Sequence, residues 1–151
     1  MIRLLQGDCL EVMKGLADNS VDLILCDLPY GTTACKWDTV IPFEPLWAHY
    51  KRAIKANGAI VLFGAQPFTS ALVMSNVKWF KYCWVWEKDK ATNHLNAKHM
   101  PMRLTEDIAV FYNKKCTYLP QLSDKKPENI RPATTKRKNT GVYGDMEKES
   151  S

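Results

Sequence analysis

The sequence lacks any long hydrophobic run. No apolar stretch among its 151 residues approaches the roughly 18 residues of a transmembrane helix, and the start, residues 1–5, has no signal-peptide core. We therefore expect a cytoplasmic protein without a membrane span.

Paired cysteines are also missing. The five cysteines form no C-x-x-C pair and their number is odd, which favours reduced thiols over disulfides.

Metal-ligand patterns are absent too. His94 and His99 lie near Asn93, without an acidic or cysteine partner at ligand spacing, so no metal site is expected.

What the sequence does contain is an ordinary globular composition, with 46% hydrophobic and 25% charged residues. Its length fits one domain of about 100–200 residues.

The positive charge is concentrated in one segment. Residues 114–138 hold eight Lys and Arg against two acidic residues, whereas the whole chain has a net charge of +5. A basic segment beside a near-neutral core is the electrostatic footprint of phosphate contacts. A solvated tail is the alternative, because the segment is rich in proline, lysine and threonine, a composition typical of partly disordered chain.

Apolar patterns predict alternating strands and helices. Val21–Cys26 is a nearly continuous apolar run, typical of a strand that is buried on both faces. Asn57 and Gly58 are expected to end a helix over 43–55. The full set of expected strands is 2–5, 21–26, 59–63, 79–86 and 108–112, and the expected helices are 10–16, 43–55 and 66–75. This alternation indicates an α/β layered sheet.

The run Asp27-Leu28-Pro29-Tyr30 follows the second expected strand. In open α/β folds, ligands bind at the carboxyl ends of the strands. The Asp27 carboxylate can accept hydrogen bonds from an amino group. Pro29 restrains Leu28 towards extended geometry, which directs the Leu28 carbonyl, and Tyr30 offers a flat face for stacking. The set suits a planar base with an exocyclic amine, although a strand-end acid can also simply cap a turn.

These four residues resemble the D-P-P-Y motif of the S-adenosylmethionine-dependent DNA amino-methyltransferases, with Leu28 in place of the first proline. Further segments resemble this family in the same order, namely 7–10, 19–24, 57–63, 86–88 and 105–111. The resemblance covers roughly residues 2–115. It implies a Rossmann-like methyltransferase sheet with helices on both faces, and methyl transfer from S-adenosylmethionine to an amino group of double-stranded DNA.

The resemblance also implies roles for particular residues. Asp27 and the Leu28 carbonyl would each accept one hydrogen of the target amine, and Pro29 and Tyr30 complete the catalytic motif. Asp8 and Cys9, together with Asp27, would contact the cofactor, although Asp8 can equally cap a helix. The candidate DNA contacts are Lys36, Trp37, Lys88, His94, Lys98, Arg103, Lys136, Arg137 and Lys138. Lys88 has an alternative, an ion pair with Glu87 or Asp89.

The target base is less sharply defined. Members with aspartate at the first motif position tend to methylate adenine N6, and those with serine tend to methylate cytosine N4, so Asp27 favours adenine. Cytosine-N4 methylation is the first alternative, and a non-catalytic module that binds DNA or a partner subunit is the second. The family implies a bacterial or phage cytoplasm, with restriction-modification as the setting.

The late glycine-rich loop of this subgroup, F-x-G-x-G, has no counterpart here. Gly141 and Gly144 have neither an apolar strand before them nor a helix after them. We therefore expect an incomplete sheet, with 1–113 as the catalytic portion and 114–151 as the start of a DNA-recognition region. Strand 21–26 would then have an unpaired side, which predicts a homodimer, aggregation, a missing C-terminal complement, or pairing with strand 2–5.

Overall fold

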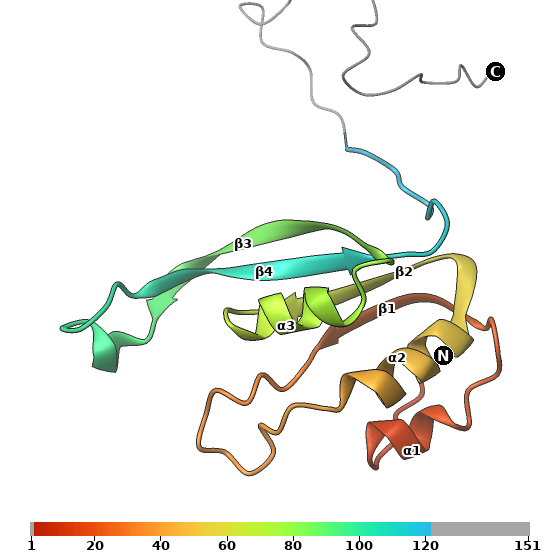
Figure 1. The fold of residues 1–151 in the computed structure, drawn as a ribbon, viewed down its shortest axis with the longest axis horizontal. Coiled ribbons are helices and arrows are strands. Elements are labelled where there is room, and N and C mark those ends of the chain that lie inside the picture. Colours follow the sequence, from red (N-terminus) through yellow and green to blue (C-terminus); the bar gives the residue numbers. More distant parts are fainter. Residues whose placement is uncertain (1, 122–151) are drawn as a thin grey trace, which may run out of the picture. The chain divides into compact units, whose positions relative to one another are not determined.

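The computed structural model describes residues 2–121. They form a four-stranded sheet in the order β1-β2-β4-β3, in which β1 and β2 are parallel and β4 is antiparallel to both of its neighbours (Figure 1). In chain order the elements are α1 (Cys9–Met13), β1 (Val21–Asp27), α2 (Phe43–Ala53), β2 (Ile54–Gly64), α3 (Phe68–Ser75), β3 (Phe80–Thr92), the short 3-10 helix η1 (His94–Asn96) and β4 (Arg103–Phe111).

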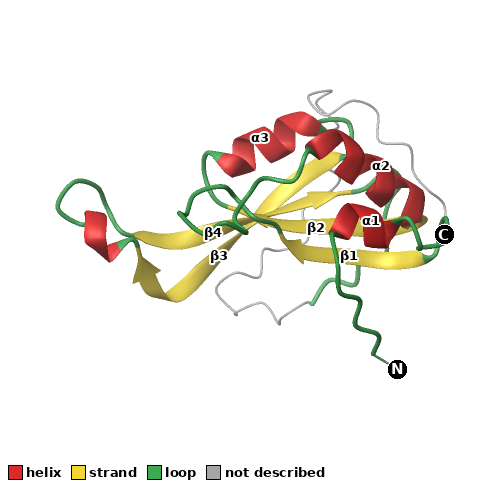
Figure 2. Ribbon diagram, turned by 90° about the horizontal axis from the view of Figure 1, so that it is seen from below, coloured by secondary structure: helices red, strands yellow, loops and turns green. Residues whose placement is uncertain are grey.

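All three α-helices lie on the same face of the sheet (Figure 2). The core fills the space between them and the strands. Its largest fully buried side chains are Phe111, Leu46, Ile60, Leu62, Leu72 and Val110. The α/β sheet expected from the sequence is confirmed. A second helical layer, expected on the other face, does not occur within residues 2–121.

β1 shows the consequence of this one-sided cover. Ile24 and Cys26 pack against the buried cluster, whereas Leu23 is 53% exposed and Leu25 is 62% exposed. The prediction that this strand is buried on both faces is therefore wrong for the described unit. Its apolar sequence fits a strand with two buried faces, but the described residues cover only one.

β1 is also an edge strand. Within the described residues only β2 pairs with it, so the unpaired side expected for β1 is confirmed. The expected strand 2–5 does not form: Ile2 is 90% exposed and Leu4 is 91% exposed. A short apolar run becomes a strand only when it pairs with another, and residues 2–5 do not pair with β1.

Helix α2 passes directly into β2. It ends at Ala53 rather than at residue 55, and Ile54 already has extended dihedral angles. Asn57 and Gly58 therefore lie in β2, at an irregularity in its pairing with β1. A Cβ atom at Gly58 would come within 2.8 Å of the Asp22 carbonyl oxygen and the Ile54 side chain. Asn57 and Gly58 therefore mark a close approach between the backbones of β1 and β2, and not the end of a helix.

The other expected elements occur with shifted bounds. α1 ends at Met13 instead of residue 16, and α3 begins at Phe68 after Pro67. β3 continues past residue 86 to Thr92, and β4 begins at Arg103 instead of residue 108. Their outer halves are polar and exposed, so hydrophobic patterning does not detect them.

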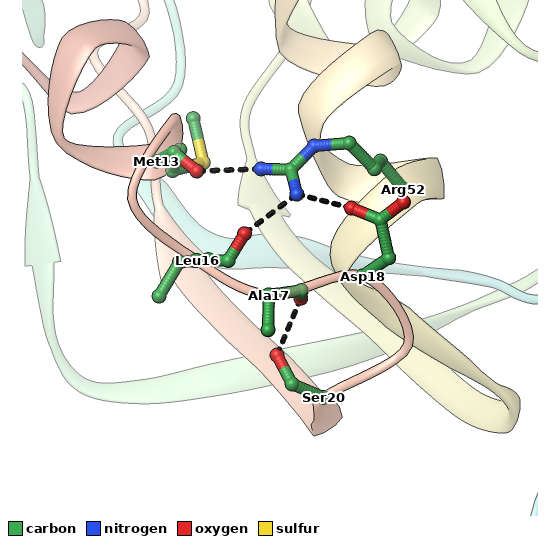
Figure 3. A network of polar contacts seen from close by, with 6 residues as sticks. All are labelled: Met13, Leu16, Ala17, Asp18, Ser20 and Arg52. Atoms are coloured by element: carbon green, nitrogen blue, oxygen red, sulfur yellow. Dashed lines mark hydrogen bonds and ion pairs between the residues drawn. The ribbon is translucent and has the colours of Figure 1, made fainter.

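Arg52 anchors the connection between α1 and β1 (Figure 3). Its guanidinium donates to the carbonyls of Leu16 and Met13 at 2.6 and 2.7 Å, and it pairs with Asp18 at 2.5 Å. The backbone joins in, because the Asn19 amide donates to the Arg52 carbonyl at 2.9 Å. These contacts hold the turn that leads into β1.

We expect Arg52→Ala to lower the free energy of unfolding by about 2–3 kcal/mol, because two carbonyls lose a charged donor and such bonds contribute about 1.5–3 kcal/mol. Asp18→Ala is the matched control. The Asp18 side chain is 66% exposed, so its loss should cost less than about 1 kcal/mol. Denaturant titration of both variants measures the difference. Equal losses would mean that the carbonyl contacts contribute nothing.

Candidate active site

The motif found in the sequence forms a tight aromatic and acidic turn at the carboxyl end of β1. Asp27 is the last residue of the strand and is exposed, whereas Leu28 is 6% exposed and belongs to the core cluster. The Tyr30 hydroxyl donates to Asp27 Oδ1 at 2.6 Å. The motif is therefore anchored in the core through Leu28, while its carboxylate faces solvent.

Two helix starts support the ring of Tyr30. Phe68, the first residue of α3, stacks on Tyr30 with centroids 5.0 Å apart and an interplanar angle of 28°. Phe43, the first residue of α2, packs against Phe68 with ring centroids 5.8 Å apart. The three rings come from separate segments, so the fold as a whole positions Tyr30.

The surroundings of Tyr30 keep its phenol protonated. Burial raises the pKa of Tyr30 well above its ordinary value, and the hydrogen bond and charge of Asp27 raise the pKa further. Glu106 adds to this pKa shift and Arg103 opposes it. Tyr30 is thus a neutral donor at physiological pH. The Asp27 carboxylate retains acceptor capacity after this one bond, since its two oxygens offer about four lone-pair sites.

Asp38 closes the loop that follows the motif. Its carboxylate accepts hydrogen bonds from the backbone amides of Gly31, Thr32 and Thr33 at 2.8, 2.9 and 2.7 Å. These amides and the Thr33 hydroxyl lower the pKa of Asp38 to about 2, so it is ionised at neutral pH. Sequence reasoning placed Asp38 only in a loop that could close over the target base or the DNA backbone, without a contact of its own.

Asp8 and Cys9 lie at the start of α1. Asp8 caps this helix by accepting from the Leu10 amide at 2.8 Å, which confirms the capping alternative. Burial raises the pKa of Cys26, and Cys9 raises it further. Leu10 and Met13 of α1 pack against the same buried cluster as Cys26 of β1. The cofactor role of Asp8 and Cys9 stays a prediction.

The candidate DNA contacts are scattered over two loops and the β3–β4 hairpin. Lys36 and Trp37 are exposed in the loop that Asp38 closes, and Trp37 is 74% exposed. His94 and Lys98 are exposed in and after η1. Lys36 and Trp37 thus follow the motif directly, whereas His94 and Lys98 lie in the connection between β3 and β4. Lys136, Arg137 and Lys138 lie outside the described residues.

Lys88 and Arg103 are already engaged within the chain. Lys88 forms an ion pair with Glu106, and the two side chains are 19% and 15% exposed. The partner is neither Glu87 nor Asp89. Glu106 lies opposite Trp86 across the β3–β4 ladder, and Lys88 is two residues further along β3. Arg103 donates to the Gln66 carbonyl at 3.3 Å. Both cations therefore lie beside the motif end of the sheet with their charged groups in use.

Residues that sequence reasoning missed are Phe43, Phe68, Asp38 and Glu106. The two phenylalanines had a weak signal, since each is the first residue of its helix.

Within residues 2–121, no cluster of at least three His, Cys, Asp or Glu side chains is suited to a metal ion. The helices of this part of the chain are also too short or too polar to cross a membrane.

The fold is similar to that of several solved structures. No protein-family model matches the sequence. M1.HpyAVI, solved as a complex with S-adenosylmethionine, superposes with a TM-score of 0.56 at 21% identity, over 87% of this chain and 64% of that chain. The PvuII cytosine-N4-specific DNA methyltransferase gives a TM-score of 0.56 at 12% identity, over 73% of this chain and 48% of that chain.

TTHA0409 from Thermus thermophilus gives a TM-score of 0.51 at 16% identity, over 84% of this chain and 58% of that chain. The chain thus spans between about half and two-thirds of the length of these structures. At these identities the likeness establishes the fold alone.

Proposed function

We propose that this chain is the catalytic portion of an S-adenosylmethionine-dependent DNA methyltransferase that acts on the N6 amine of adenine. The observation that carries the proposal is the turn Asp27–Tyr30 at the carboxyl end of β1. The carboxylate is solvent-facing and the stacked phenol lies 2.6 Å from it. The fold is shared with a DNA methyltransferase and with a protein solved with S-adenosylmethionine, which supports this interpretation.

The chemistry asks mainly for positioning. An adenine amine is a weak nucleophile because its lone pair is delocalised into the ring. Asp27 accepts one N6 hydrogen, the Leu28 carbonyl accepts the other, and Tyr30 stacks on the base. Orientation of this kind supplies up to about 7–11 kcal/mol in favourable cases. Extruding the base costs a few kcal/mol, and stacking offsets about 1–3 kcal/mol of it.

The cofactor supplies the electrophilic methyl group. Asp8, Cys9 and Asp27 are the residues proposed to hold it. Their surroundings fit this role in one respect: Asp8 Oδ1 is used by the Leu10 amide, and the carboxylate keeps capacity for a hydroxyl or amino donor. Lys36 and Trp37, exposed beside the motif, and His94, Lys98 and the basic segment 136–138 are proposed as DNA contacts.

Two alternatives have their own support. Cytosine-N4 transfer is favoured by the likeness to the PvuII enzyme, which acts on that base, whereas Asp27 favours adenine. A non-catalytic module is favoured by the edge position of β1, because within residues 2–121 the outer side of the motif strand offers unpaired backbone groups. On the main proposal, that edge pairs with a second copy or a complementary chain. A bacterial or phage cytoplasm and a restriction-modification setting remain predictions.

The test is methyl transfer from labelled S-adenosylmethionine to unmethylated duplex DNA, followed by digestion to nucleosides. We expect the label in N6-methyladenine. Label in N4-methylcytosine would keep the enzyme class and overturn the base. No label, with DNA binding intact, would favour a fragment that needs its C-terminal complement, and the test is then repeated with that complement added. A continued absence of label would favour the non-catalytic module.

A further inference from the structure

The segment after the motif folds around one carboxylate. Asp38 is 8% exposed although it lies in an otherwise exposed loop. It takes hydrogen bonds from three successive amides, those of Gly31, Thr32 and Thr33, all between 2.7 and 2.9 Å. Successive amides that converge in this way make an anion-binding concavity. Here the chain fills that concavity with its own side chain.

The backbone is shaped for this contact. Gly31 has φ of 68°, a left-handed conformation that favours glycine. A Cβ atom there would come within 2.9 Å of the Val40 side chain, so the two ends of the loop are in close contact. At the far side, the Asp38 amide donates to the Cys35 carbonyl at 3.0 Å. Residues 31–40 therefore form a closed loop whose base is Asp38.

This loop begins at the residue that follows Tyr30. The direction in which the chain leaves Tyr30 is set by the Gly31 amide, which Asp38 holds. The Tyr30 hydroxyl in turn donates to Asp27. Asp38 is thus linked to the motif by three consecutive fixed peptides, without touching Asp27 itself.

We propose that Asp38 is a positioning residue of the methyl-transfer site, whose carboxylate fixes the turn after Tyr30 and so keeps the Tyr30 hydroxyl on Asp27. The proposal rests on the proposed function for its effect on catalysis, but the link from Asp38 to Tyr30 can be measured without any activity. Because the pKa of Asp38 is lowered to about 2, the carboxylate remains an acceptor for all three amides throughout the neutral range.

The variants are Asp38→Ala, which removes every acceptor, and Asp38→Asn, which keeps one acceptor oxygen and replaces the other with an NH2 donor. Asp22→Asn is the matched control, since Asp22 is an exposed aspartate on β1 whose bond goes to Lys55 at 2.7 Å. Two readouts are taken on the full chain. The first is the titration of Tyr30, followed by NMR with carbon-13-labelled tyrosine and assigned with Tyr30→Phe. The second is kcat and KM for duplex DNA.

In the parent chain, burial raises the pKa of Tyr30 above its usual value, and the hydrogen bond and charge of Asp27 raise it further. We expect Asp38→Ala to move this pKa down towards the ordinary ~10. It should also lower kcat by roughly 100-fold, the effect of a misplacement of about 1 Å, with KM changed less than about threefold. Asp38→Asn should fall between, and Asp22→Asn should match the parent in both readouts.

Each other result has a defined meaning. An unchanged Tyr30 titration in a folded Asp38→Ala chain overturns the proposal, whatever happens to kcat. A shifted titration with kcat unchanged in an active enzyme overturns the catalytic part and leaves a structural clamp. A shifted titration in a chain whose parent transfers no methyl group even with the complementary chain added refutes the proposed function, while the control of Tyr30 by Asp38 stands.

Discussion

Replacement of Asp27 by alanine is expected to lower methyl transfer to DNA by about 100- to 1,000-fold, the usual cost of removing one positioned hydrogen-bond partner of a reacting group. The reason is local. Asp27 offers the exposed carboxylate of the motif turn, and the Leu28 carbonyl cannot accept both hydrogens of the amine. The measurement is single-turnover methyl transfer from labelled cofactor.

Two comparisons isolate the chemistry in this test. DNA affinity of Asp27→Ala should stay within about threefold of the parent, because one exposed carboxylate contributes little to phosphate contacts. Asp22→Ala removes an exposed acid five residues earlier on the same strand and should leave transfer unaltered. Full activity of Asp27→Ala would end the assignment of this turn as the site.

Truncation of Phe111 to alanine is expected to destabilise the fold by about 3–5 kcal/mol, the range for a fully buried phenylalanine. Phe111 is completely buried at the end of β4. Its ring lies 4.9 Å from that of Trp47 on α2 and 5.6 Å from that of Phe80 on β3. Because small domains are stable by only about 5–15 kcal/mol, we expect a large loss of folded chain.

Urea titration with the tryptophan signal measures this loss. Phe111→Leu keeps most of the buried volume and should cost clearly less, at about 1–1.5 kcal/mol. Phe111 pairs with Ile60 of β2, whereas Asp27 pairs with Phe63, so the ring lies away from the motif end of the sheet and activity per folded molecule should be retained in both variants. A loss below about 1 kcal/mol for Phe111→Ala would show that the three-ring contact does not hold helix α2 on the sheet.

The sequence predicted those elements whose signals are local. The apolar run of β1 and the apolar face of α2, with buried Leu46, Trp47 and Tyr50, identified these elements within a few residues. The motif Asp27–Tyr30 was recognisable because its residue types are unusual at a strand end. Each of these depends on neighbours along the chain.

Features that depend on distant partners were not predictable. Residues 2–5 have strand-like composition but no strand beside them in the described unit. Lys88 pairs with Glu106 rather than with an adjacent acid, since the β3–β4 register decides which side chains meet. Asp38 lies seven residues from Gly31, and only the fold of the loop reveals that it holds three amides.

The alternation along β1 divides two kinds of constraint between neighbouring residues. Ile24 and Cys26 face the helices and support the core, while Leu25 and Asp27 are exposed. Substitutions at the second pair leave the buried contacts in place, and substitutions at the first pair remove them. Changes at the exposed end of this strand and changes in its thermal tolerance therefore arise at different residues of one seven-residue segment.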